Sequence, residues 1–341
     1  MMKLTGLIVW CWFGFALVMP SAEWQVQKVD TDAGFLGLCA VDEKIVWASG
    51  TKGTFVRTVD AGKNWQVGQV AGGEKLIFSD VEALNGETAW LLSAGEGTDS
   101  RIYKTMDGGK RWELQFQNEK PKAFFNGLAF WDEQNAVVAL SDPGKRQLVL
   151  VGTTNGGARW EAVKAKMPAP LWREYEFAAT WSCLVAQGQS NLWFSTGGWI
   201  RGLVFRSVDR GQTWTYTETP VPAMTNIAAI YGLAFRDERH GVAVGNQNDF
   251  IFSDDGGARW RVNAAEQRLG FRTGVAWVDA PKGWAVVAVG PTGSNLRTSK
   301  GEWKKLDDAS YNVVSVGRFS PRAVWAAGPN GRIARLVNVR E

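Results

Sequence analysis

Short segments in which apolar and polar residues alternate follow one another along the chain, separated by turns rich in Gly, Asp and Asn. Alternation with a period of two indicates β-strands that bury one face. In the first clear unit the predicted strands, named A to D, are Leu36–Val41, Ile45–Ser49, Thr54–Arg57 and Trp65–Val67. Strands A and B recur at Leu128–Trp131 with Ala136–Leu140, Leu233–Phe235 with Gly241–Val244, and Val275–Val278 with Trp284–Val289. The pattern predicts an all-β protein of repeated four-stranded units.

One phrase is repeated five times, each time between predicted strands C and D. It reads Ser or Thr, any residue, Asp or Asn, any residue, Gly, two further residues and Trp. The copies are Thr58–Trp65, Thr105–Trp112, Thr153–Trp160, Ser207–Trp214 and Ser253–Trp260. Their Trp residues recur at intervals of about 46 to 54 residues, a period typical of propellers and solenoids.

The phrase suits a tight turn between two strands. Its acid or amide can accept hydrogen bonds from backbone N–H groups one to three residues onward, and its Gly allows a positive φ. Its Trp is expected to lie between neighbouring sheets. The phrase resembles the Asp-box, or BNR repeat, which implies a structural and not a catalytic role for the third residue of each copy, namely Asp60, Asp107, Asn155, Asp209 and Asp255.

Two further units complete the count. Thr298–Trp303 is a shortened copy that keeps its Trp but has lost the Asp, and the last unit has only three strands, Val313–Val316, Ala323–Ala327 and Arg332–Leu336. The missing fourth strand is expected at Glu23–Val26, because Trp24 resembles a post-turn Trp and closure would hide the edges of the sheet. Residues 23–341 are therefore predicted to form a single seven-bladed β-propeller of four-stranded blades with Asp-box turns, whose last blade is closed by the N-terminal strand.

Residues 1–22 are predicted to be a secretory signal peptide, because Lys3 precedes the apolar run Leu4–Met19 and small residues follow. The run is short for a transmembrane helix. Pro20 suits a cleavage site poorly, which leaves an uncleaved anchor as the alternative. The expected location is periplasmic or secreted, with membrane association only through such an anchor or through a partner.

The composition excludes several classes of site. Lys and Arg total 38 against 34 Asp and Glu, a balance too small and too dispersed to indicate nucleic-acid binding. Cys39 and Cys183 are predicted on opposite sides of the ring, so both are expected to be buried and unpaired. The single histidine, His240, is expected in a surface turn. No metal site and no cofactor are predicted.

Many of the 19 Trp residues have a packing role in this interpretation, among them five in predicted strand B: Trp47, Trp90, Trp193, Trp284 and Trp325. Function is expected where loops converge. The C-to-D and A-to-B turns share one side of the ring, here called the turn face. The D-to-A and B-to-C connections form the opposite side, the loop face, which is where binding residues usually gather. The candidate ligand-binding residues there are Glu96, Asn126, Asp142, Glu176, Trp199, Arg201, Asn246 and Arg272.

Enzyme classes find little support. A sialidase would need an arginine triad, a Tyr nucleophile and an acid/base Asp, yet its Arg-Ile-Pro signature is absent and only five Tyr occur. Stretches such as Ser100–Gly109, Leu128–Asp132 and Val204–Gly211 resemble the photosystem II stability/assembly factor propellers. That resemblance implies an exported, non-catalytic scaffold that assists the assembly or stability of an envelope or membrane protein complex. The chain is expected to be a monomer that binds a protein or a small polar ligand on its loop face. The alternative is a glycan-binding or glycoside-hydrolase-like propeller of the sialidase type, using Glu176 with Asp142 or Glu96.

Overall fold

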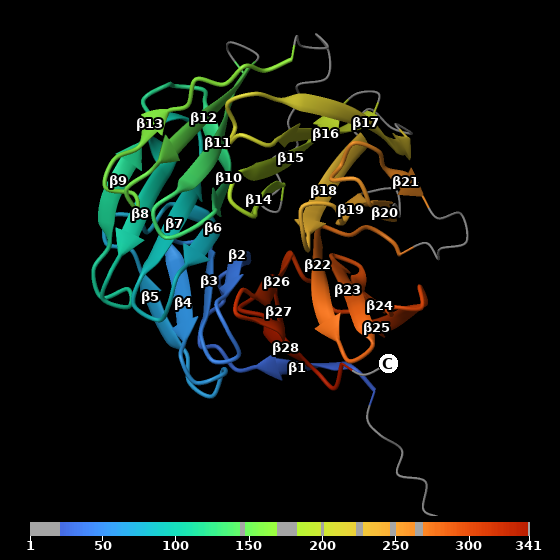
Figure 1. The fold of residues 1–341 in the computed structure, drawn as a ribbon. Helices are drawn as coiled ribbons and strands as arrows, with labels where there is room; N and C mark the ends of the chain where they lie inside the picture. The colour runs from blue at the N-terminus through green and yellow to red at the C-terminus, as the bar shows by residue number, and fades with distance from the viewer. Residues whose placement is uncertain are drawn as a thin grey trace, which may run out of the picture.

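The computed structural model describes residues 21–143, 147–168, 183–198, 201–222, 228–245, 250–262 and 269–339. Seven antiparallel blades form a closed ring, with the first strand of each blade innermost (Figure 1). The predicted all-β, seven-bladed fold is confirmed. Nearly all of the predicted signal peptide lies outside the described residues. Within those residues no helix is long and apolar enough to cross a membrane.

The first three blades follow the chain in the order A to D. Blade 1 consists of β2 (Phe35–Ala40), β3 (Val46–Gly50), β4 (Thr54–Thr58) and β5 (Gln66–Gln69). Blade 2 consists of β6 (Ile77–Ala83), β7 (Ala89–Ala94), β8 (Arg101–Thr105) and β9 (Glu113–Gln117), with the short 3-10 helix η1 (Gly97–Asp99) between β7 and β8. Blade 3 consists of β10 (Phe124–Phe130), β11 (Ala136–Asp142), β12 (Gln147–Thr153) and β13 (Glu161–Ala162).

The next three blades repeat the same arrangement. Blade 4 consists of β14 (Leu184–Gln187), β15 (Asn191–Gly198), β16 (Arg201–Ser207) and β17 (Thr215–Pro222). Blade 5 consists of β18 (Ala228–Phe235), β19 (Gly241–Gly245), β20 (Phe250–Ser253) and β21 (Arg261–Val262). Blade 6 consists of β22 (Gly274–Ala280), β23 (Gly283–Gly290), β24 (Gly293–Arg297) and β25 (Trp303–Asp307).

Blade 7 joins the two ends of the chain. It consists of β26 (Val313–Gly317), β27 (Ser320–Ala327), β28 (Ile333–Val337) and β1 (Glu23–Gln27). Strand β1 pairs antiparallel with β28, from Glu23 opposite Val337 to Gln27 opposite Ile333, and Figure 1 shows it in blue beside the red strands. The predicted closure by the N-terminal strand is confirmed.

Blades 4 and 5 are not separate sheets. Because β14 is only four residues long, β15 extends beyond it and pairs with β18 through Gly197 opposite Ala229 and Gly198 opposite Ala228. One backbone ladder therefore continues from blade 4 into blade 5.

The core lies between the blades. Seven clusters of buried apolar side chains occupy the described part of the ring, and each joins two neighbouring blades. Trp47, Trp90, Trp193 and Trp325 are fully buried in these clusters, as predicted. Trp284 is not, since 36% of it is exposed. The corresponding position in blade 6 is Val286, which pairs with Arg297 as Trp47 pairs with Arg57.

Candidate functional site

Backbone hydrogen bonds establish the two faces of the ring. In five blades the residue before the turn glycine donates its N–H to a carbonyl in the A-to-B connection of the same blade. The donor and acceptor pairs are Ala61 and Lys44, Gly108 and Glu87, Gly156 and Gln134, Arg210 and Ser190, and Gly256 and Arg239. The C-to-D and A-to-B turns therefore share one face, as expected, and the candidate binding residues belong to the other.

The five repeated turns are built alike. In the first, Thr58 Oγ1 donates to Asp60 Oδ1 at 2.8 Å and accepts the Gly62 N–H at 3.0 Å. Asp60 Oδ1 also accepts the backbone N–H of Asn64 at 2.9 Å. The amide that it binds lies four residues onward, so the expected reach of one to three residues was too short. The Thr hydroxyl and the Asp carboxylate thus each accept a backbone N–H from across the turn, which explains why the phrase contains both residues.

The same turns need a left-handed backbone at two successive positions. The phrase glycines Gly62, Gly109, Gly157, Gly211 and Gly257 have φ between 84° and 88°. The residue before each also has a positive φ, and there the chain uses Ala61 (63°) and Arg210 (58°) as well as Gly. The phrase as read from the sequence allows any residue at this position before the Gly, so its positive φ was not predicted.

The loop-face candidates divide by what the structure describes. Glu176, Trp199 and Asn246 lie outside the described residues, and for Arg201 only the backbone, at the start of β16, is described. Glu96 precedes η1 in the B-to-C connection of blade 2 and is exposed. Since Glu176 is not described, the carboxylate pair of the hydrolase alternative stays a prediction.

Asn126 and Asp142 lie together in blade 3. Asn126 Nδ2 donates to Ser141 Oγ at 2.7 Å, and Ser141 directly precedes Asp142. Both candidates are almost fully buried, and Asp142 lies 3.9 Å from the Lys120 ammonium. The structure thus brings these two together, while Glu96 and Arg272 belong to blades 2 and 6.

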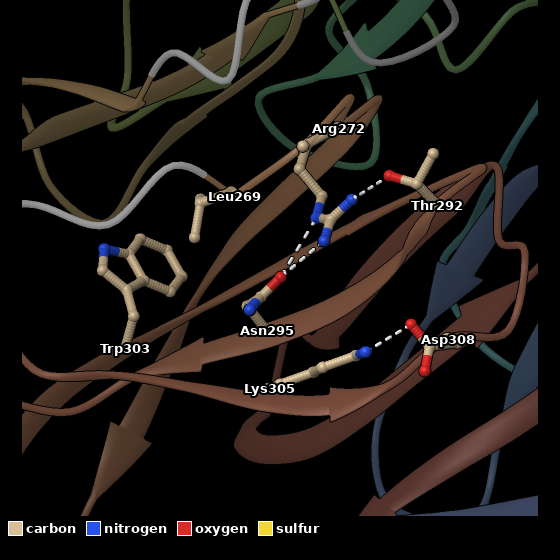
Figure 2. A pocket seen from close by; sticks show the side chains of 8 residues that line it. Leu269, Arg272, Thr292, Asn295, Trp303, Lys305 and Asp308 are labelled. Atoms are coloured by element: carbon tan, nitrogen blue, oxygen red, sulfur yellow. Dashed lines mark hydrogen bonds and ion pairs between the residues drawn. The ribbon is translucent and has the colours of Figure 1, made fainter.

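Arg272 lies in a pocket of about 460 Å³ in blade 6. The D-to-A loop supplies Leu269, Gly270 and Arg272, and the remaining walls come from the B-to-C loop, strands β24 and β25, and the residue that follows β25 (Figure 2). These walls are Thr292, Asn295, Trp303, Lys305 and Asp308.

The guanidinium of Arg272 is held by neutral groups. Its Nε and Nη2 donate to Asn295 Oδ1 at 3.2 and 2.6 Å, and its Nη1 donates to Thr292 Oγ1 at 2.7 Å and to the Phe271 carbonyl at 2.8 Å. Only 4% of Arg272 is exposed. Burial lowers the pKa of the guanidinium, and the charges of Asp307 and Asp308 act in the opposite direction. Among the described residues, no carboxylate forms an ion pair with it.

A second polar group, which sequence reasoning missed, lies where the inner strands meet. Asp80 Oδ2 in β6 accepts the N–H of Leu128 in β10 at 2.9 Å, so it joins blades 2 and 3. Burial, with a smaller contribution from the Glu82 carboxylate, raises the pKa of Asp80 to about 8. Glu82 pairs with Arg318 of blade 7 at 2.9 Å. One signal existed in the sequence. At this β-bulge blades 1, 3 and 5 have Gly37, Gly127 and Gly232, whereas blade 2 has Asp80, which has a side chain that can reach its neighbour.

The two described cysteines and the histidine occupy structural positions. Cys39 and Cys183 are buried and form no disulfide, and Cys39 Sγ accepts the N–H of Ala83 in the next blade. His240 lies in the A-to-B turn of blade 5, where its Nδ1 contacts Asp237 at 2.8 Å. Within the described ranges, no group of three or more His, Cys, Asp and Glu could hold a metal ion.

Comparison with known proteins gives distant relatives. No protein-family model matches the chain. It is 24% identical over 290 residues to the photosystem II assembly lipoprotein Ycf48 of Picosynechococcus, covering 72% of this chain and 79% of the relative. It is also 24% identical over 257 residues to the chloroplastic photosystem II stability/assembly factor HCF136 of Arabidopsis thaliana, covering 70% of this chain and 58% of that longer protein.

Solved structures agree on the fold. The structure described as YCF48 bound to D1 peptide superposes with a TM-score of 0.65 at 17% identity, covering 95% of this chain and 98% of the other. The WD40 repeats of RRP9 also give a TM-score of 0.65, at 11% identity, covering 93% and 98%. The chain is therefore a seven-bladed propeller that resembles the Ycf48 and HCF136 proteins.

Proposed function

We propose that this chain is a non-catalytic scaffold propeller that binds a segment of a protein partner on its loop face and assists the assembly or stability of a membrane protein complex. The observation that carries the proposal is the Arg272 pocket, where a buried cation on the face where loops gather has only neutral hydrogen-bond partners among the described residues. Both curated relatives are named as assembly factors of photosystem II, and one related structure is described as holding a peptide.

The compartment is part of the same proposal. Residues 1–22 would direct export, and the propeller would act in the periplasm or outside the cell as a monomer with Asp-box turns on its opposite face. One curated relative is named a lipoprotein and the other is chloroplastic. A partner with a domain on the exported side of a membrane suits both relatives.

Site-specific photocrosslinking in cells that produce the full chain tests this. A photoreactive amino acid replaces Pro291, which is exposed on the loop face of blade 6 beside the pocket. The matched control replaces Lys300, which is exposed on the turn face of the same blade. We expect light-dependent adducts with one membrane-complex subunit from position 291 and none from position 300.

Two results would contradict the proposal. Equal adducts from both faces would show that the loop face is not the specific binding surface. The absence of any protein adduct would refute the claim that the chain binds a protein partner. A glycan array probed with the purified propeller tests the alternative, since specific binding of an oligosaccharide without a protein adduct would favour a glycan-acting propeller.

A further inference from the structure

Arg272 has hydrogen-bonding capacity left over. A guanidinium carries five N–H donors. Four of them are used, one by Nε, two by Nη1 and one by Nη2. Because Asn295 Oδ1 accepts from Arg272 twice, the Asn295 amide has a fixed orientation, and Figure 2 shows its Nδ2 turned away from the guanidinium. The pocket therefore offers donors from both residues.

The charge of Arg272 is not balanced by its direct contacts. Burying a charged group is costly unless an opposite charge pairs with it, and Asn295, Thr292 and the Phe271 carbonyl are all neutral. These contacts fix the plane of the guanidinium without neutralising it. An arginine needed only for packing would gain more from an internal carboxylate, yet the described residues provide none within ion-pair distance.

The rest of the pocket complements an anion with an apolar body. Lys305 adds a second cation, although it already pairs with Asp308 at 2.5 Å. Leu269 and Trp303 form an apolar wall beside these polar groups (Figure 2). Asp307 and Asp308 act on the charge of Arg272, so one negative charge on the ligand is favoured over the two of a phosphate. A volume of about 460 Å³ suits a small organic ligand or one to two residues of a peptide.

We propose that the Arg272 pocket binds a carboxylate, with Arg272 and Asn295 donating to its oxygens and Trp303 and Leu269 packing against the group that carries it. This deepens the proposed function, on which it rests, by naming the chemistry that a partner segment presents, either a chain terminus or an acidic side chain. A free small carboxylic acid is the other source of the same chemistry.

Isothermal titration of the purified propeller separates these sources. The probes are 3-phenylpropionate, its uncharged amide 3-phenylpropanamide, a short acetylated peptide that ends in a free Phe carboxylate, the same peptide amidated, and inorganic phosphate. We expect each carboxylate to bind about 10- to 100-fold more tightly than its amide, the effect of hydrogen bonds between charged groups. Carboxylates that bind no better than their amides, or phosphate that binds most tightly, would overturn the proposal.

Asn295→Asp is the most informative variant. It has the shape of the native residue and gives Arg272 an internal carboxylate, so we expect a higher melting temperature together with loss of carboxylate binding. Asn330→Asp, at an exposed position on the same face, makes the same change in net charge and should alter neither. Unchanged binding by the Asn295→Asp protein would refute the site.

Arg272→Met removes the charge directly and should abolish the preference for acid over amide. Arg101→Met is its control, because Arg101 lies on the loop face of blade 2 and already contacts Asp99 and Tyr103. If the Arg272→Met protein fails to fold, the Asn295→Asp result decides alone. If no carboxylate binds preferentially in the titration but crosslinking at position 291 is intact, the carboxylate pocket is refuted and the scaffold function stands. If carboxylates bind but position 291 forms no protein adduct, the pocket is a site for free acids only.

Discussion

Trp24 Nε1 donates a hydrogen bond to Ser294 Oγ at 2.8 Å, although 270 positions separate them in the chain. Ser294 donates in turn to Asp307 at 2.5 Å, and the same carboxylate accepts the Tyr311 hydroxyl at 3.0 Å. The Trp24 and Tyr311 rings also lie in contact, 5.4 Å between centroids. The N-terminal strand is therefore fixed twice, by its ladder with β28 in blade 7 and by one side chain that reaches blade 6.

Trp24→Phe should weaken this second attachment. The change keeps most of the ring but removes the donor to Ser294, and the net loss of one hydrogen bond costs about 0.5–1.5 kcal/mol. Urea unfolding measures the effect. Trp284→Phe is the control, because Trp284 is partly exposed and should change the free energy of unfolding by less than about 0.5 kcal/mol. Equal effects in the two variants would mean that the Trp24 bond does not help to close the ring.

The sequence predicts the ring because each blade repeats the same local solution. The turn phrase and its Trp mark six blades, and Trp24 marks the seventh through the same spacing. Period-two alternation does not, however, set the register at the end of a strand. Trp284 was predicted to be buried, but the register places Val286 opposite Arg297, as Trp47 lies opposite Arg57, so Val286 takes the buried position and Trp284 lies near the exposed start of β23.

The candidate site was predictable only in part. Arg272 follows from its place in the loop just before an inner strand, but its neutral partners Asn295 and Thr292 come from a different strand and loop, which no local pattern indicates. Asp80 was missed because an Asp within an alternating strand looks like any exposed polar residue. Its carboxylate accepts the N–H of Leu128 in the next blade, a contact between blades that no local pattern indicates.

Asp107→Ala should destabilise the protein. The carboxylate accepts the Arg111 backbone N–H and the Thr105 hydroxyl, at 2.9 and 3.0 Å, and losing these acceptors should cost about 1–3 kcal/mol. Asp107→Asn is the matched control, since Asn155 makes the same two contacts in blade 3. We expect the Asn variant to retain most of the stability in thermal unfolding. An Ala variant as stable as the native protein would refute the role assigned to this residue.

Ala61→Gly should stabilise the protein. Ala61 has a φ of 63°, where a side chain is unfavourable, and Gly relieves that strain by about 0.5–1 kcal/mol after its greater freedom in the unfolded chain is counted. Gly156→Ala makes the reverse change at the equivalent position, where φ is 66°, and should destabilise by a similar amount. The two melting temperatures should move in opposite directions, and movement in the same direction would show that strain does not govern this position.

Asp80→Asn should change the dependence of stability on pH. Burial raises the pKa of Asp80 from its ordinary 3.8 to about 8, so between these values the folded protein holds a proton that the unfolded chain has lost. Its contribution to the free energy of unfolding is then fully present below pH 3.8 and is lost as the pH rises toward 8. Glu82, whose pKa burial also raises, and its partner Arg318 are the charged groups nearby. Asn carries no charge at any pH, so the stability of the Asp80→Asn protein relative to the native protein should rise between pH 5 and pH 8 in urea unfolding.

Asp32→Asn is the control. Asp32 is exposed and its hydrogen bond with Lys52 lowers its pKa, so the difference in stability between this variant and the native protein should be the same at pH 5 and pH 8. A flat difference for Asp80→Asn as well would mean that Asp80 is already ionised in the folded protein.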